Sequence, residues 1–162
     1  MLPLKGSLRI ICLILLIAYL GLLAKNILFK KSPSYYKNYF KREYRYYSIH
    51  DGWKNANTKP FNTIRLFYNS RNLNPEYKQN NLWGNFVGFI PLGILLPLIF
   101  AWFRNGVSVV IAGFLLSLLF ETAQLVFGLG IFDVDDLILN TAGTIGGFII
   151  VWPFRGKSLA RK

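Results

Sequence analysis

Four long apolar runs limit the folds open to this sequence. They fall at residues 10–29, 82–103, 106–127 and 134–154. About 20 apolar residues in a helix span the roughly 30 Å hydrocarbon core of a bilayer. Lipid offers the backbone no hydrogen-bond partners, so such runs must be helical. The sequence therefore predicts an all-α membrane protein with four transmembrane helices, in which one long basic loop joins the first two.

The chain divides into four predicted parts. Residues 1–29 form the first transmembrane helix, whose basic lead resembles a signal peptide; the three later spans favour an uncleaved signal anchor. Residues 30–81 form a basic aromatic loop that is partly interfacial. Residues 82–154 form a three-helix membrane core, and residues 155–162 form a basic tail.

Tyrosines are concentrated in the loop: six of the nine lie between Tyr35 and Tyr47, among lysines and arginines. Such interleaving is typical of surfaces that stack single-stranded nucleic acid, but also of residues that anchor a protein at the membrane interface. The flanking spans favour the interface. Phe61, Ile64 and Phe67 recur at helical spacing, which predicts one short amphipathic helix on the membrane surface.

The basic surplus indicates the partners and the orientation. Nineteen Lys and Arg face seven acids, for a net charge of +12. In a membrane protein this favours anionic lipid or a cell-wall polymer over nucleic acid as the partner. The long loop holds more positive charges, which would place it inside by a simple count. The tails and the Arg104 turn are the more densely basic, so we expect a plasma-membrane protein with both termini cytoplasmic.

Four of the seven acids lie in or beside the last two spans: Glu121, Asp133, Asp135 and Asp136. A carboxylate at membrane depth costs at least roughly 2.5 kcal/mol, so such residues are usually functional. Steps of three and four place Asp133, Asp136 and Asn140 on one helix face. Asp135 points about 100° away from Asp136 and is the least expected member.

A short loop holds the last two spans antiparallel, so groups on both can meet at one depth near the outer leaflet. The sequence predicts a polar patch, with a candidate ligand-binding set of Asn85, Glu121, Gln124, Asp133, Asp136 and Asn140. Glycines at small-xxx-small spacing predict close helix packing. These helix-packing candidates are Gly84, Gly88, Gly143 and Gly147.

Three interpretations of the patch remain open. The side chains can be hydrogen bonds between helices, about 0.6 kcal/mol each, with Asp133 only an N-cap. They can bind a cationic or polyhydroxyl head group, or a divalent cation with Glu121, Asp133 and Asp136 as candidate ligands. Glu121 and Asp136 can also be a catalytic acid–base pair acting on a lipid-linked substrate. No serine–histidine pair or glycine-rich phosphate loop accompanies them, which makes catalysis the weakest interpretation.

An ordered series of short motifs resembles a known family. It comprises PFNTI at Pro60–Ile64, NFVGFIPLG at Asn85–Gly93, E-x-x-Q at Glu121, and D-x-x-D-x-x-x-N-x-x-G at Asp133–Gly143. Together they are similar to the VanZ-like membrane proteins, the teicoplanin-resistance-associated proteins of Gram-positive bacteria. The resemblance covers about residues 58–150 and leaves out the first 57.

The resemblance implies a polytopic plasma-membrane protein that lowers susceptibility to lipid-tailed glycopeptide antibiotics without remodelling the peptidoglycan precursor. Its pattern includes Glu121, Gln124, Asp133, Asp136 and Asn140, but not Asp135. A glycopeptide or a lipid-linked molecule is then the expected ligand. Two alternatives stay open. One is a membrane enzyme or metal-binding protein that acts on a lipid-linked envelope substrate; the other is a small transporter or assembly scaffold that oligomerises through the Gly84 and Gly143 faces.

Overall fold

A computed structural model of the chain describes residues 6–30, 33–39, 41–69 and 75–155; the predicted basic tail lies outside these residues apart from its first position. All the secondary-structure elements in the described ranges are helices, which confirms the predicted all-α fold. The elements are α1 (Gly6–Leu28), α2 (Pro33–Tyr39), α3 (Arg42–Lys54), α4 (Asn62–Asn69), α5 (Pro75–Ile99), η1 (Ala101–Arg104), α6 (Gly106–Val126), α7 (Val134–Val151) and η2 (Trp152–Arg155).

The predicted four transmembrane helices are confirmed. In the part of the chain that the structure describes, four helical segments are long and apolar enough to cross a membrane: Gly6–Leu28, Asn81–Ile99, Gly106–Val126 and Val134–Phe154. The second ends earlier than the predicted Phe103, because Phe100 is extended and the chain then turns through η1. Asn105 starts the next helix, where its side-chain oxygen accepts a hydrogen bond from the Ser108 amide at 2.7 Å.

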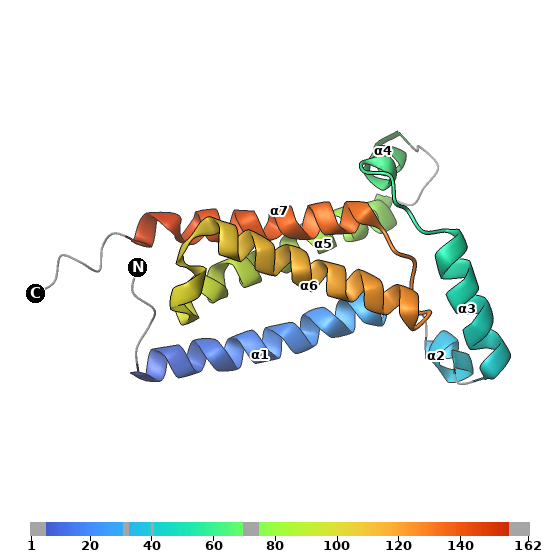
Figure 1. Cartoon of the computed structure of the whole chain (residues 1–162), viewed down its shortest axis with the longest axis horizontal. Coiled ribbons are helices and arrows are strands. Elements are labelled where there is room, and N and C mark those ends of the chain that lie inside the picture. Colours follow the sequence, from blue (N-terminus) through green and yellow to red (C-terminus); the bar gives the residue numbers. More distant parts are fainter. Residues whose placement is uncertain (1–5, 31–32, 40, 70–74, 156–162) are drawn as a thin grey trace, which may run out of the picture.

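The four long helices lie side by side in an elongated bundle (Figure 1). α1 begins and α7 ends at one end of the bundle, where η1 also lies, while α2, α3 and α4 gather at the other end. The segment between α1 and α5 thus contains three helices: α4 is the short amphipathic helix predicted from Phe61, Ile64 and Phe67, whereas α2 and α3 were not predicted. Two helices begin at prolines, Pro33 and Pro75, whose fixed φ suits the first helical position.

Helix α7 packs directly against the backbone of α5. A Cβ on Gly143 would overlap the carbonyl group of Phe86, and one on Gly147 would overlap that of Ile90. Small residues permit such close approach where lipid provides no hydrophobic force between helices. The Gly143 face is therefore covered by α5 within the chain, which leaves it unavailable for the contact between copies that the scaffold alternative would use.

The other two glycine candidates lie on α5 away from this contact. A Cβ on Gly88 would lie 3.6 Å from the Leu23 side chain of α1, which is ordinary contact. Around Gly84, which is exposed, no described atom lies within 4 Å of the position a Cβ would take. The structure therefore gives Gly84 no packing partner within the described part of the chain.

Apolar side chains face both inward and outward along the bundle. One buried cluster joins α1, α5 and α6 and comprises Cys12, Leu16, Leu23, Ile27, Phe89, Leu92, Leu96, Ile99 and Phe120. Large apolar residues such as Ile14, Ile17 and Leu119 remain exposed on the outer faces. An exposed apolar belt is what a helical bundle surrounded by acyl chains requires.

The α5–α7 contact predicts a marked difference between two identical substitutions. Gly143→Val should destabilise the protein by at least about 1–3 kcal/mol, because the new side chain displaces backbone rather than a flexible side chain. Gly84→Val should change stability by about 0.5 kcal/mol or less, as expected at an open surface position. Thermal unfolding of the detergent-solubilised variants, followed by circular dichroism, measures both. Equal melting temperatures would contradict the packing described above.

Candidate functional site

The polar residues gather where α6 ends and α7 begins. Gly128 terminates α6 with a positive φ of 63°, and the amides of Leu129 and Gly130 return to the Gln124 carbonyl at 2.8 and 3.3 Å. This left-handed glycine cap is a common helix ending. Asp133 then starts α7, and its side chain accepts a hydrogen bond from the Asp135 amide at 2.8 Å. The prediction that Asp133 is an N-cap is confirmed.

Asp133 also binds the segment that precedes α4. One carboxylate oxygen accepts from Asn57 Nδ2 at 2.8 Å, and the other accepts from Thr63 Oγ1 at 2.5 Å. The backbones pair as well: the Asn57 amide donates to the Phe132 carbonyl, and the Val134 amide donates to the Asn57 carbonyl. Both Asp133 oxygens therefore have structural partners.

Asp135 holds the start of α4. Its side chain is completely buried, and its two oxygens accept hydrogen bonds from the backbone amides of Phe61 and Ile64, at 2.5 and 3.0 Å. A carboxylate is favoured there because the first amides of a helix lack partners within that helix. The sequence excluded Asp135 because it points away from Asp136. Because it points away from Asp136, Asp135 reaches the start of α4 instead. In the sequence, Pro60 followed by Asn62 and Thr63 indicates that a helix starts there.

Glu121 and Asp136 form the buried carboxyl pair. Their exposed fractions are 1% and 6%. One Glu121 oxygen accepts from the Asp133 amide at 2.9 Å, and the Glu121 and Asp136 carboxyl groups are neighbours. Lys30 is the nearby cation: its Nζ lies 3.8 Å from Asp136 Oδ2, and its side chain is 39% exposed. Sequence reasoning missed Lys30, which follows α1 in a strongly basic segment that gives no sign of which lysine matters.

Two of the three amide side chains in the predicted patch, Gln124 and Asn140, donate to other helices, whereas Asn85 bonds within its own helix. Gln124 Nε2 donates to the Ile27 carbonyl at 2.6 Å, which links α6 to the end of α1. Asn140 lies one turn after Asp136 and donates through Nδ2 to Ser117 Oγ at 2.8 Å. Asn140 Oδ1 is buried and has no hydrogen-bond partner among the described residues. Asn85, in contrast, donates to Asn81 one turn earlier in its own helix, at 3.2 Å.

The geometry gives no support to a metal centre built from Glu121, Asp133 and Asp136. Among the described residues, no group of three or more His, Cys, Asp or Glu side chains is arranged to hold a metal ion. The contacts of Asp133 provide the physical reason, since its oxygens are already bonded to Asn57 and Thr63.

Tyrosines of α2 bind the ends of two long helices. The Tyr35 hydroxyl donates to the Gly128 carbonyl, and the Tyr39 hydroxyl donates to the Phe127 carbonyl at 2.5 Å. Tyr36 reaches the Leu28 carbonyl at 3.5 Å. The last carbonyls of a helix have no partner within it, so these hydroxyls supply acceptors with donors where the spans end. Part of the tyrosine-rich stretch therefore caps α1 and the α6–α7 loop.

The position of Asp135 predicts local opening of α4 on Asp135→Asn. The amide can accept through one oxygen only and turns an N–H group toward a backbone donor. Losing a hydrogen bond to a charged group costs about 1.5–3 kcal/mol, so exchange of the amides at residues 61–69 should accelerate by about 10- to 100-fold. Hydrogen–deuterium exchange measures this. Asp51→Asn is the control, since Asp51 is exposed on α3 and accepts from Asn55, the residue that follows this helix; unchanged exchange in Asp135→Asn would contradict the assignment.

Comparison with known proteins identifies the family. The VanZ/LLP1 family model matches residues 15–155, which contain Lys30, Glu121 and Asp136. No curated protein and no solved structure matches the chain. The match starts inside α1, so it includes most of the first 57 residues that the motif resemblance left out. With its four apolar helices, the chain is a multi-pass membrane protein that belongs to the VanZ/LLP1 family.

Proposed function

We propose that this protein is a non-enzymatic component of the Gram-positive envelope that lowers susceptibility to lipid-tailed glycopeptide antibiotics. Its buried Glu121–Asp136 pair would bind a cationic head group. One observation carries the proposal: two neighbouring, almost fully buried carboxyl groups have, among the residues that the structure describes, one lysine in ion-pair contact with them. Buried charges require compensation, so the second carboxyl needs either a proton or another cation.

Helix capping and hydrogen bonds between segments account for the neighbouring acids Asp133 and Asp135 but not for the Glu121–Asp136 pair. Asp133 caps α7 and binds Asn57 and Thr63, while Asp135 binds the start of α4. The Asp133 amide uses one oxygen of Glu121, and an amide side chain could accept that bond as well. Neither contact requires two carboxyl groups at one place within apolar helices, where each is costly.

The contacts favour binding over catalysis. Ser117, whose Oγ accepts a hydrogen bond from Asn140, is completely buried and therefore not open to a lipid-linked substrate as a nucleophile. His50, the single histidine, is exposed on α3. Lys30, the more exposed of the two, lies 3.8 Å from Asp136 Oδ2, which is longer than a hydrogen bond and permits exchange. An ammonium group of a ligand can replace the Lys30 ammonium there, and Asn140 Oδ1 offers an unused acceptor one turn deeper.

The proposal requires the carboxyl pair to lie near the outer leaflet. The pair lies at the bundle end that holds α2–α4, opposite the start of α1 and the η1 turn (Figure 1). Cytoplasmic termini, the orientation favoured by the charge density of the tails, would place this end at the external surface. Lipid-tailed molecules that act on the envelope from outside then meet the pair before crossing the membrane.

Orientation can be measured with two single-cysteine proteins in a Cys12→Ala background. Tyr68→Cys on α4 should react with an impermeant maleimide on intact cells, whereas Trp102→Cys in η1 should react only after lysis. Both residues are highly exposed, at 89% and 80%, so access differs only by side of the membrane. The reverse labelling pattern would put the carboxyl pair at the cytoplasmic face and contradict the proposed outer-leaflet site.

Antibiotic susceptibility tests the function itself. Expression in a susceptible Gram-positive host should raise the inhibitory concentration of teicoplanin, which carries a lipid tail, more than that of vancomycin. The double variant Glu121→Gln, Asp136→Asn keeps side-chain size and removes both charges, so it should return teicoplanin susceptibility to the level of cells without the protein. Broth dilution measures both antibiotics, with membrane abundance checked by immunoblot.

Asp51→Asn is the matched control, because it makes the same chemical change on the exposed surface of α3 and should protect like the unmodified protein. Unchanged susceptibility to both antibiotics on expression of the unmodified protein would refute the proposed function. Full protection by the double variant would instead refute the role of the carboxyl pair, and would equally exclude acid–base catalysis by it.

A further inference from the structure

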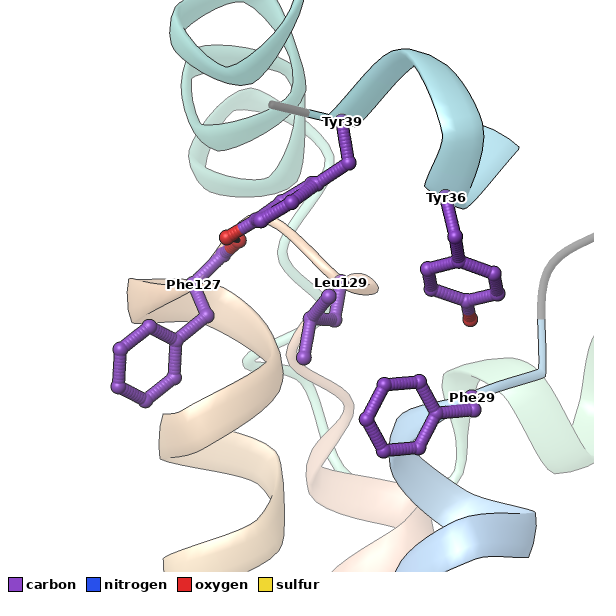
Figure 2. A pocket seen from close by; sticks show the side chains of 5 residues that line it. All are labelled: Phe29, Tyr36, Tyr39, Phe127 and Leu129. Atoms are coloured by element: carbon purple, nitrogen blue, oxygen red, sulfur yellow. Dashed lines mark hydrogen bonds between the residues drawn. The ribbon is translucent and has the colours of Figure 1, made fainter. Parts of the chain in front are cut away.

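An apolar cavity lies beneath helix α2, apart from the carboxyl pair. Its volume is about 420 Å³, within the roughly 300–1,000 Å³ typical of small-molecule sites. Five side chains line it: Phe29, Tyr36, Tyr39, Phe127 and Leu129. Figure 2 shows Tyr36 pointing from α2 toward Phe29, which follows α1, while Tyr39 extends from α2 toward the Phe127 backbone and Leu129 lies between the two sides.

The position of the cavity is set by the ends of two transmembrane helices. Phe29 directly follows α1, and Phe127 directly follows α6, so the cavity lies where apolar spans give way to polar segments. Both phenylalanines remain more than half exposed. The Tyr39 hydroxyl is bonded to the Phe127 carbonyl, and the surface that lines the space is almost entirely apolar. Such a cavity suits a hydrocarbon chain that enters from the surrounding bilayer.

The charge of the same segment indicates the head group. Residues 30–81 contain eleven Lys and Arg against three acids. Lys37 on α2 follows the cavity residue Tyr36, and Lys41, the N-cap of α3, comes two positions after Tyr39; both lysines are exposed. Lysines beside an apolar site at the membrane surface attract anionic lipid, at about 1 kcal/mol per basic residue.

We propose that this cavity binds an acyl chain of an anionic phospholipid from the bilayer, with the lipid phosphate held by Lys37 and Lys41. The lipid would bridge α2 to the ends of α1 and α6 and help to fix the helices above the bundle. This site is independent of the proposed antibiotic function, because its ligand is a resident lipid and its residues are not those of the carboxyl pair.

Native mass spectrometry of the full chain tests the proposal without any antibiotic. The purified protein is incubated with phosphatidylglycerol or with phosphatidylcholine of identical chains, and retained lipid is counted. We expect one retained phosphatidylglycerol and a much weaker phosphatidylcholine signal. Leu129→Trp fills the cavity and should weaken phosphatidylglycerol binding by about tenfold or more. Leu119→Trp, the same change at an exposed outward position of α6, should leave binding unchanged.

Equal retention of both lipids would overturn the assignment of an anionic ligand, and full retention by Leu129→Trp would overturn the cavity as its site. A second pair of variants does not depend on filling the cavity. Lys37→Glu with Lys41→Glu should reduce phosphatidylglycerol retention, whereas Lys54→Glu with Lys59→Glu changes the net charge equally at exposed positions elsewhere and should not. Equal losses in the two double variants would show only general attraction and would refute the proposed site.

Discussion

The end of the bundle that holds α2–α4 is governed by one constraint: polar groups buried among apolar helices must find partners inside the protein. Glu121 and Asp136 can be this deep only because Lys30 and the Asp133 amide reach them. Gln124 Nε2 donates to a carbonyl of α1, and Asn140 Nδ2 donates to Ser117. These contacts connect α1, α6 and α7, so the same bonds that satisfy the polar groups also fix the relative positions of three spans.

The same constraint explains why the segment between α1 and α5 folds onto the bundle. Helix ends leave carbonyls and amides without partners. Tyr35 and Tyr39 supply donors to carbonyls that follow α6, and Asp135 supplies acceptors to the first amides of α4. The segment between α1 and α5 buries few apolar residues, and hydrogen bonds between side chains and backbone groups hold it near both of its ends.

The sequence predicted the features that depend on local periodicity. The lengths of the apolar runs predicted the transmembrane helices. Steps of three and four placed Asp136 and Asn140 on the face of α7 that meets Glu121 and Ser117 of α6. Contacts between distant segments were not predictable in this way. Lys30 is one of many basic residues beside the first span, and the partner of Asp135 lies 74 positions away. Helices α2 and α3 were missed because their apolar residues follow no clear periodic pattern.

The motifs that appear separate in the sequence form one unit in the structure. The PFNTI segment at Pro60–Ile64 supplies the amides and hydroxyl that bind Asp133 and Asp135, so these motifs support each other rather than a ligand. Once these two acids are assigned, Glu121 and Asp136 are the acids near α7 that no structural contact requires as a charged pair. Two carboxyl groups inside a membrane bundle, where no structural contact needs both charges, are the observation that supports the proposed binding of a cation.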